Sequence, residues 1–149
     1  MSAAIHTIGF AGKPAREFFG LLRDHGVRTL VDIRLNNTGQ LAGFAKARDL
    51  EYFLAELIGI AYVYYPLLAP EAELLSAYRA KELGWAEYEA RYAAILRQRK
   101  IGSLIKAEYA GWQAPVCLLC SEPTADHCHR RLAAEFIAKH LKIKNIVHL

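Results

Sequence analysis

Residues 117–131 read Cys-Leu-Leu-Cys-Ser-Glu-Pro-Thr-Ala-Asp-His-Cys-His-Arg-Arg. The segment begins as an apolar strand, passes through a turn and continues into the first turn of a helix. It holds all three cysteines of the chain, together with two histidines, two arginines and two carboxylates. A strand that leads into a helix is the building unit of α/β proteins, which bind their ligands at such junctions. The segment therefore indicates both the fold class and the place of the functional site.

Strands and helices alternate on both sides of this segment. Apolar runs bounded by glycine, proline or polar residues predict strands at 5–10, 27–33, 61–65, 115–120 and 144–149. Amphipathic spacing predicts helices at 14–26, 45–58, 72–83, 85–100 and 125–141. Repeated βαβ units favour parallel strands with helices on both faces. We therefore predict an α/β fold, a single-domain, Rossmann-like three-layer sandwich over residues 1–149 whose mainly parallel sheet has about five strands.

The composition is that of a compact, mildly basic protein. Hydrophobic residues make up 54% of the 149 residues, which excludes a disordered chain, and the formal net charge of +4 permits an anionic partner. No apolar run has the length of a membrane span, and the first residues lack the basic and apolar regions of a secretory signal. The number of cysteines is odd. These features predict a cytoplasmic protein with free thiols and no membrane partner.

The three cysteines differ in their expected surroundings. Cys117 and Cys120 are three residues apart in a strand, so their side chains point to opposite faces of the sheet. We interpret Cys117 as a small buried residue, whereas Cys120, at the carboxyl end of the strand, faces the crevice where α/β folds bind ligands. Cys128 lies in the expected first turn of the next helix and close to Arg131. We expect the helix N-terminus and this arginine to lower the pKa of the Cys128 thiol.

Three interpretations of the cysteine cluster stay open. In the first, Cys120 or Cys128 is a nucleophile or redox thiol, and a nearby histidine or Glu122 accepts the proton. In the second, Cys120, Cys128 and a histidine bind a metal, although the Leu-Leu between Cys117 and Cys120 is not typical of a zinc turn. In the third, the cysteines pack in the core while the histidines and arginines cap the helix.

A second polar cluster follows the strand at 27–33. Asp32 and Arg34 are two residues apart and therefore lie on the same face. Because a charged aspartate in a buried strand is costly unless paired, we expect Asp32 to pair with Arg34 or with an arginine of the first cluster. Such a pair either fixes the loop or orients a substrate. Asn36 adds an amide group in the next loop, and Gly9 lets a ligand approach the backbone.

The two clusters are expected to form one site. In a parallel sheet the carboxyl ends of the strands lie at one edge, which is the usual place of ligand binding. The residues that we expect to converge there are Gly9, Asp32, Arg34, Asn36, Cys120, Glu122, Cys128, His129, Arg130 and Arg131.

Three motifs resemble the domain-of-unknown-function 488 family: Val31-Asp32-Ile33-Arg34, Leu119-Cys120-Ser121-Glu122 and His127-Cys128-His129-Arg130-Arg131. The resemblance extends over nearly the whole chain, from Thr7 to Leu149. It implies a small, Rossmann-like α/β protein of cytosolic, bacterial type, and it implies no settled activity. Many relatives carry His-Ser where this chain has Phe10-Ala11, so a role for that histidine does not transfer, whereas the Cys-x-Glu and Cys-His-Arg elements are intact.

These features favour a cysteine-dependent enzyme that acts on a phosphate-bearing substrate, a nucleotide or nucleic acid, at the carboxyl edge of the sheet. Cys120 or Cys128 is then the nucleophile or redox centre, Glu122 or His129 moves protons, and Asp32 helps to orient the substrate. The expected groups for binding the anion are Arg34, Asn36, Gly9, Arg130, Arg131 and the helix N-terminus. The alternatives are a non-catalytic nucleic-acid-binding module and a Cys/His metal-binding protein. The sequence indicates no particular cofactor and no oligomeric state.

Overall fold

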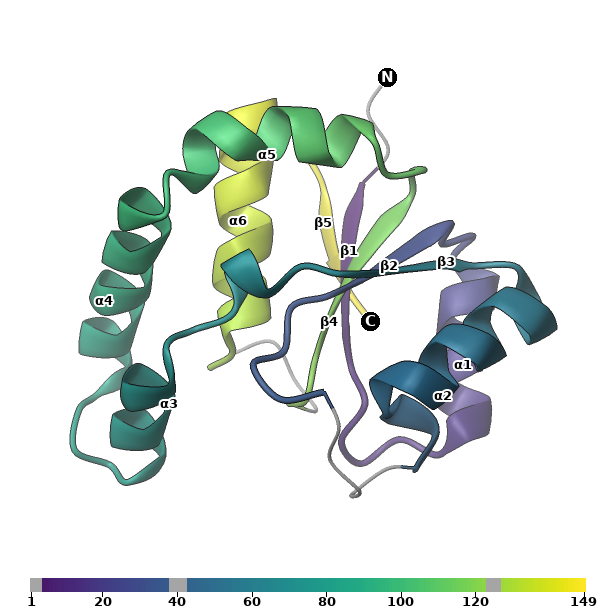
Figure 1. Cartoon of the computed structure of the whole chain (residues 1–149), viewed down its shortest axis with the longest axis horizontal. Helices are drawn as coiled ribbons and strands as arrows, with labels where there is room; N and C mark the ends of the chain where they lie inside the picture. The colour runs from purple at the N-terminus through teal and green to yellow at the C-terminus, as the bar shows by residue number, and fades with distance from the viewer. Residues whose placement is uncertain (1–3, 38–42, 123–126) are drawn as a thin grey trace.

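The computed structural model describes residues 4–37, 43–122 and 127–149. Its centre is a five-stranded sheet with the strand order β3-β2-β4-β1-β5 (Figure 1). The strands are β1 (Ile5–Gly9), β2 (Thr29–Asp32), β3 (Ala61–Tyr64), β4 (Val116–Cys120) and β5 (Ile146–His148). Every neighbouring pair is parallel, so all five carboxyl ends lie at one edge. The predicted α/β class, with a mainly parallel sheet of about five strands, is confirmed.

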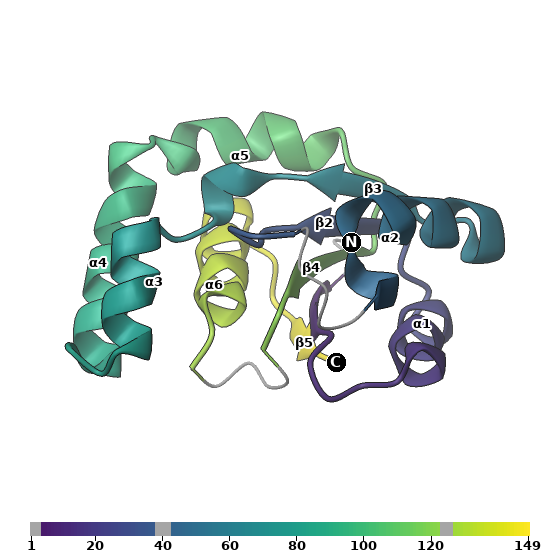
Figure 2. The same cartoon turned by 60° about the horizontal axis from the view of Figure 1, so that its bottom comes forward.

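Helices cover both faces of the sheet, as the predicted three-layer sandwich requires. One face packs against α1 (Ala15–Asp24) and α2 (Ala47–Phe53), which continues as a π-helical turn, Leu54–Ile58. The other face packs against α3 (Ala72–Arg79), α4 (Trp85–Gln98), α5 (Ile101–Ala110) and α6 (His129–Leu141). Short 3-10 turns occur at Gly43–Ala45 and Pro66–Leu68. Figure 2 shows the sheet between the two sets, with α1 to the right and α3 and α4 to the left.

None of the helices in the described part of the chain has both the length and the apolar character that are needed to cross a membrane.

The central strands β2 and β4 are buried along their whole length because both of their faces are covered. Their side chains alternate between the two layers of helices. Leu30 and Cys117 belong to the core beside α1 and α2, whereas Val31 and Leu118 belong to the core beside α4, α5 and α6. Cys117 is fully buried, which confirms its interpretation as a small core residue. Cys120, three residues later, points to the opposite face.

The structure differs from the predicted helices in one additional helix and in several helix ends; α3, for example, ends at Arg79 rather than at the predicted residue 83. Helix α5 was not predicted, because its buried residues Ile101 and Ile105 enclose Gly102 and Ser103, which are weak helix formers. It is separated from α4 by Lys100, whose left-handed backbone (φ 58°) turns the chain sharply, so that α4 ends earlier than predicted.

Helix α6 begins at His129 rather than at the predicted residue 125. Residues 125 and 126 lie outside the described residues, and His127 and Cys128 are not helical. Cys128 has an extended backbone, and its Sγ accepts the Arg130 N–H at 3.5 Å, so it is the N-cap of α6.

Gly9, the last residue of β1, has no room for a side chain. A Cβ at this position would overlap the Glu122 carbonyl and the Arg130 guanidinium. The missing Cβ therefore lets the segment after β4, and the first turn of α6, lie directly against the end of β1. The groups that lie close to the Gly9 backbone are the protein's own Glu122 carbonyl and Arg130 guanidinium.

We expect the variant Gly9→Ala to lose about 3 kcal/mol of unfolding free energy, because backbone and a buried arginine must move. The matched variant Gly20→Ala, in the middle of α1, places its Cβ no nearer than 3.9 Å to another group. Alanine is the better helix former, so this variant should gain about 0.5 to 1 kcal/mol. Urea denaturation measures the unfolding free energy of both variants. A Gly9→Ala variant as stable as the wild type would contradict the close contact of Glu122 and Arg130 with Gly9.

Candidate active site

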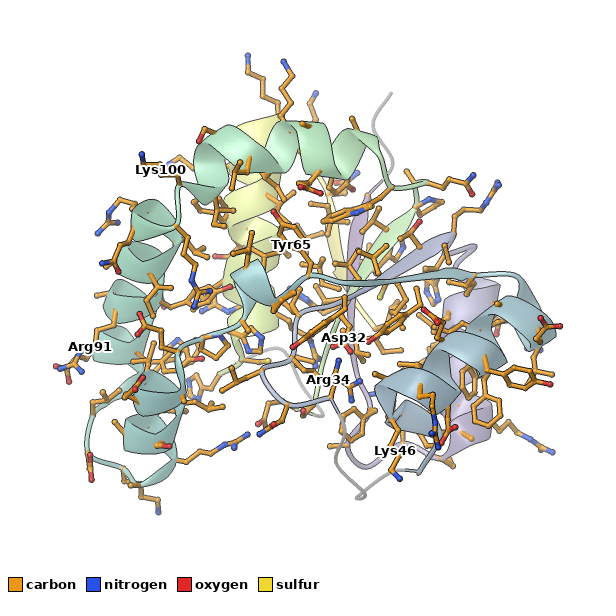
Figure 3. The ribbon with its side chains drawn as sticks, viewed as in Figure 1. Asp32, Arg34, Lys46, Tyr65, Arg91 and Lys100 are labelled. Carbon is orange, nitrogen blue, oxygen red and sulfur yellow. The ribbon has the colours of Figure 1, made fainter. Side chains whose placement is uncertain are left out.

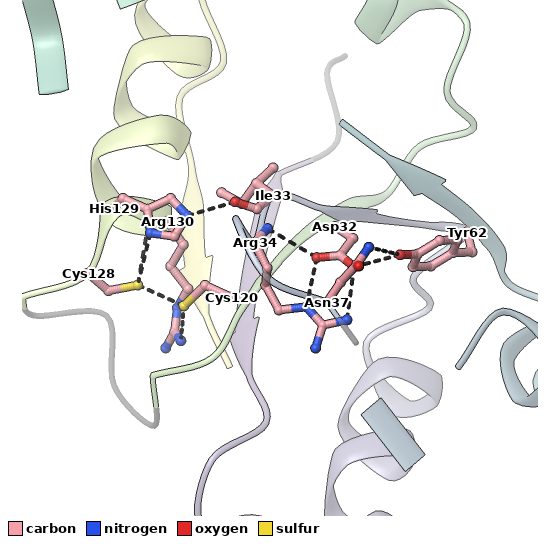
Figure 4. Close-up of polar contacts among 9 residues, drawn as sticks. All are labelled: Asp32, Ile33, Arg34, Asn37, Tyr62, Cys120, Cys128, His129 and Arg130. Atoms are coloured by element: carbon pink, nitrogen blue, oxygen red, sulfur yellow. Dashed lines mark hydrogen bonds and ion pairs between the residues drawn. The ribbon is translucent and has the colours of Figure 1, made fainter. Parts of the chain in front are cut away.

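Two neighbouring thiols lie where β4 ends and α6 begins. The Sγ atoms of Cys120 and Cys128 are 2.7 Å apart, and both residues are buried (Figure 4). The Arg130 guanidinium lies beside them, with its Nη1 3.2 Å from the Cys120 Sγ. The structure thus brings two thiols and a cation together at the carboxyl edge of the sheet.

The contacts of the two thiols determine which sulfur loses its proton more easily. Burial alone raises the pKa of the Cys120 thiol, but the hydrogen bond from Cys128 and the charge of Arg130 outweigh burial, so the pKa lies below its ordinary value. The hydrogen bond to Cys120 and burial raise the pKa of Cys128 well above its ordinary value. Of the two thiols, Cys120 is therefore the one that its surroundings favour as a thiolate, with the Cys128 S–H as the donor to it. The expectation of a lowered pKa at Cys128 is wrong, because its thiol serves as the donor to Cys120.

Arg130 is fully buried although it carries a charge. Its Nη1 donates to the Glu122 carbonyl at 2.6 Å as well as to the Cys120 Sγ. Its Nε has no hydrogen-bond partner among the described residues. A buried guanidinium needs anionic and carbonyl partners, and among the described contacts of Arg130 the Cys120 sulfur is the group that supplies a negative charge when it is ionised.

His129 is buried beside the thiols and is neutral at ordinary pH. Its Nε2 donates to the Ile33 carbonyl at 2.9 Å, which leaves the Nδ1 lone pair facing the Cys128 Sγ at 3.9 Å (Figure 4). Burial, with a smaller effect of the Arg130 charge, lowers the pKa of His129 to about 4. The imidazole joins the end of β2 to the thiol pair through these two contacts.

The second cluster is a buried ion pair at the end of β2. The Asp32 carboxylate accepts from the Arg34 Nε and Nη2, each at 2.9 Å, and from the Tyr62 hydroxyl at 2.5 Å. Asp32 is fully buried, and Arg34 is 4% exposed. The guanidinium carbon of Arg34 also lies 5.3 Å from the centre of the Phe10 ring. Figure 3 shows the pair below β2 in the middle of the molecule, far from the outer residues Arg91 and Lys100.

Two adjoining cavities open beside the thiols. The smaller, about 60 Å³, is lined by Cys120, Arg34 and Asn36, and the larger, about 380 Å³, is lined by Cys128, Tyr78 and Tyr88. Four residues border both cavities: Leu75, Arg79, Glu122 and His129. The larger cavity falls within the usual volume range of small-molecule sites. Cys120 therefore lines a small cavity with arginines in its wall, and that cavity adjoins a larger, partly aromatic one.

The structure brings most of the predicted residues together, with one exception. Asp32, Arg34, Asn36, Cys120 and Glu122 lie around the smaller cavity or in contact with its lining, and Cys128, His129 and Arg130 join them from α6. Gly9 lies beneath Glu122 and Arg130. Arg131 points away, pairing with Glu135 at 2.7 Å and with Glu89 at 3.5 Å.

No group of three or more Asp, Glu, His or Cys side chains suited to hold a metal ion occurs among the described residues.

A family model described as "Domain of unknown function DUF488" matches residues 14–137 of the chain. The chain belongs to the DUF488 family. A search of curated proteins found no match, and a search of solved structures found none either. The match includes both clusters of the site, and it names no activity.

Two site residues of this DUF488 protein were not predicted from its sequence. Arg79 comes from α3 and lines both cavities. Lys13 follows the glycine turn after β1, and its pKa is lowered by burial and by the nearby charge of Arg130. The same-edge argument that selected Gly9 also applies to Lys13, whereas nothing local in the sequence marks Arg79.

The Asp32–Arg34 pair predicts a stability change. In Asp32→Asn the buried Arg34 charge loses its partner, so we expect a loss of about 3–5 kcal/mol of unfolding free energy. Asp24→Asn is the matched control, because Asp24 and its partner Arg23 are 65% and 68% exposed and such pairs contribute about 0–1 kcal/mol. Urea denaturation measures both. Equal losses of unfolding free energy in the two variants would show that the buried Asp32–Arg34 pair contributes no more to stability than an exposed pair does.

The lowered pKa of His129 predicts a pH dependence of stability. In the unfolded chain a histidine binds its proton below about pH 6.5. In the native DUF488 chain, where the pKa is about 4, His129 stays neutral over that interval. The unfolded state then binds more protons, so this residue lowers the unfolding free energy by up to about 1.4 kcal/mol per pH unit as the pH falls from 6.5 to 4.

The variant His129→Gln should remove that slope, while His127→Gln, which changes an exposed neighbour, should keep it. Urea denaturation at intervals from about pH 6.5 to pH 4 measures the three slopes. A slope in His129→Gln as steep as that of the wild type would contradict the buried, neutral imidazole.

Proposed function

We propose that this protein is a cysteine-dependent enzyme that acts on a phosphate-bearing substrate, with Cys120 as the nucleophile. The observation that carries the proposal is the Cys120 Sγ held between the Cys128 thiol at 2.7 Å and the Arg130 Nη1 at 3.2 Å, on the wall of a cationic cavity. A thiolate rather than a thiol is the reactive form of cysteine, and cations and hydrogen-bond donors favour it.

The charges around the smaller cavity support an anionic substrate. Arg34 and Arg79 line it, and Arg79 has no ion-pair partner among the described residues. The Nη1 of Arg34 is not used in the pair with Asp32, whose bonds go to Nε and Nη2. Asn36 adds an amide to the same wall. Arginine side chains bind phosphate oxygens through several parallel hydrogen bonds, so a phosphate group suits this cavity.

The adjoining larger cavity supports a substrate of nucleotide size. Tyr78, Tyr88, Leu75 and Leu83 give it an aromatic and apolar lining, on which a base or another flat group can stack. Glu122 is exposed and borders both cavities, so it is the proton-transfer group with access to the substrate. His129 faces the Cys128 thiol instead. A thiolate in this role suits a reducing compartment such as the cytoplasm.

The reaction class is nucleophilic substitution through a covalent cysteine intermediate. The electron pair of the Cys120 thiolate forms a bond to the electrophilic atom of the substrate, and the leaving group departs with the electron pair of the broken bond. Arg34 and Arg79 hold the phosphate, and Asp32 keeps Arg34 in place through its two hydrogen bonds.

Alkylation with iodoacetamide, followed by peptide mass analysis, tests the thiolate. Cys117 is the matched control, because it and Cys120 are both fully buried and burial raises the pKa of Cys117 well above its ordinary value. We expect Cys120 to react at least ten times faster than Cys117 at pH 7, since the reacting species is the thiolate. Equal rates for the three cysteines would rule out an activated thiol.

Protection by anions tests the substrate class. Inorganic phosphate and a nucleoside monophosphate should slow the alkylation of Cys120, and Arg79→Gln should weaken this protection about tenfold. Arg91→Gln, an exposed arginine on α4 distant from the site, should leave it unchanged (Figure 3). Fast alkylation without protection would contradict the phosphate-bearing substrate. Nucleic-acid binding that persists in Cys120→Ser and falls steeply with salt would favour the non-catalytic module instead.

A further inference from the structure

The sulfur atoms of Cys120 and Cys128 are placed to form a bond with each other. We propose that the two cysteines are a reversible dithiol–disulfide couple, oxidised by a small hydroperoxide, in which Cys120 attacks the peroxide and Cys128 resolves the product. The inference rests on the Cys120 thiolate of the proposed function, and it does not depend on the substrate of that function.

The distance between the two sulfurs favours this pairing. Their separation of 2.7 Å exceeds the length of a disulfide bond by only about 0.65 Å. Cys120 is the last residue of β4, and Cys128 is the N-cap of α6, so each is held at the end of a regular element. Cys117 is in the core on the opposite face of β4. The three cysteines of the chain therefore offer one close pair.

The cavities give each sulfur its own access. The cavity of about 60 Å³ beside Cys120 has room for a few water-sized molecules, which includes hydrogen peroxide. The cavity of about 380 Å³ beside Cys128 has room for a larger reductant. Hence a small oxidant reaches Cys120, while a dithiol that reduces the couple reaches the Cys128 side.

The oxidation balances without a metal or cofactor. The Cys120 thiolate forms a bond to one peroxide oxygen, the O–O bond breaks, and the departing hydroxide or alkoxide takes up the proton that Cys120 had lost to solvent. The Cys128 thiol then attacks the sulfenic sulfur, the S–S bond forms, and the oxygen leaves with the thiol proton as water. In sum, two thiols and one hydrogen peroxide give a disulfide and two waters, and an organic hydroperoxide gives an alcohol in place of one water.

The reverse reaction and its consequence follow from the same charges. A dithiol reduces the disulfide by two exchange steps and itself becomes a disulfide. Arg130 stabilises the Cys120 thiolate but gains nothing from the neutral disulfide, so the couple favours its reduced form. While the disulfide persists, the nucleophile of the proposed reaction is absent.

Mass analysis of the full chain after treatment with hydrogen peroxide at pH 7 tests the couple. We expect the wild type to lose the mass of two hydrogen atoms and to recover it with dithiothreitol. Cleavage on the N-terminal side of Asp49 and Asp126 places Cys117 and Cys120 on one peptide, residues 49–125, and Cys128 on the next, residues 126–149. In Cys117→Ser, the matched control, the linked peptides should still form, which assigns the bond to Cys120 and Cys128.

The variant Cys128→Ser keeps a good N-cap residue for α6 and removes the resolving sulfur. Cys120 should then gain two oxygen atoms as sulfinic acid, and dithiothreitol should not restore it. If the wild type also ends as sulfinic acid with Cys128 free, or forms no disulfide although Cys120 is alkylated selectively, the couple is wrong and the proposed function stands. If the disulfide forms but phosphate gives no protection, the couple stands and the proposed substrate class fails.

Discussion

The buried charge of Arg130 is the constraint on which the site depends. Taking a guanidinium out of water is costly unless anionic and carbonyl groups replace the water. The Glu122 carbonyl and the Cys120 sulfur meet this need at 2.6 and 3.2 Å. Gly9 makes the arrangement sterically feasible, because any side chain there would overlap Glu122 and Arg130. The charge that stabilises the end of β4 against α6 therefore also lowers the pKa of Cys120, together with the hydrogen bond from Cys128.

Much of the fold could be predicted from the sequence because its signals are local. The apolar runs at β2 and β4 are typical of parallel strands covered on both faces, and the alternation of strands and helices determines the layer order. Helix α5 was missed because Gly102 and Ser103 weaken its helical pattern. The start of α6 was predicted too early, since the extended backbone of Cys128 depends on contacts with β4 rather than on its own sequence.

The site was predictable in its position and not in its chemistry. The rule that parallel strands end at one edge predicts that the Asp32–Arg34 cluster and the cysteines converge, and the structure places them there. Which cysteine ionises more easily depends on which sulfur accepts the hydrogen bond and on which sulfur the Arg130 guanidinium contacts. Both are tertiary contacts. A helix N-terminus favours ionisation of Cys128. The Arg130 guanidinium, however, turns back toward β4 and favours ionisation of Cys120.

The ionisation state of Cys120 is the central claim, and NMR of the protein labelled with ¹³C at the cysteine Cβ measures it directly. The three resonances can be assigned by comparison with Cys117→Ser and Cys120→Ser. We expect the Cβ of Cys120 to have the chemical shift of a thiolate at pH 7 and to titrate below the ordinary cysteine pKa of about 8.5. Titration of Cys120 at or above that value would show that Arg130 is buried beside a neutral thiol at pH 7, and that the site holds no activated thiolate.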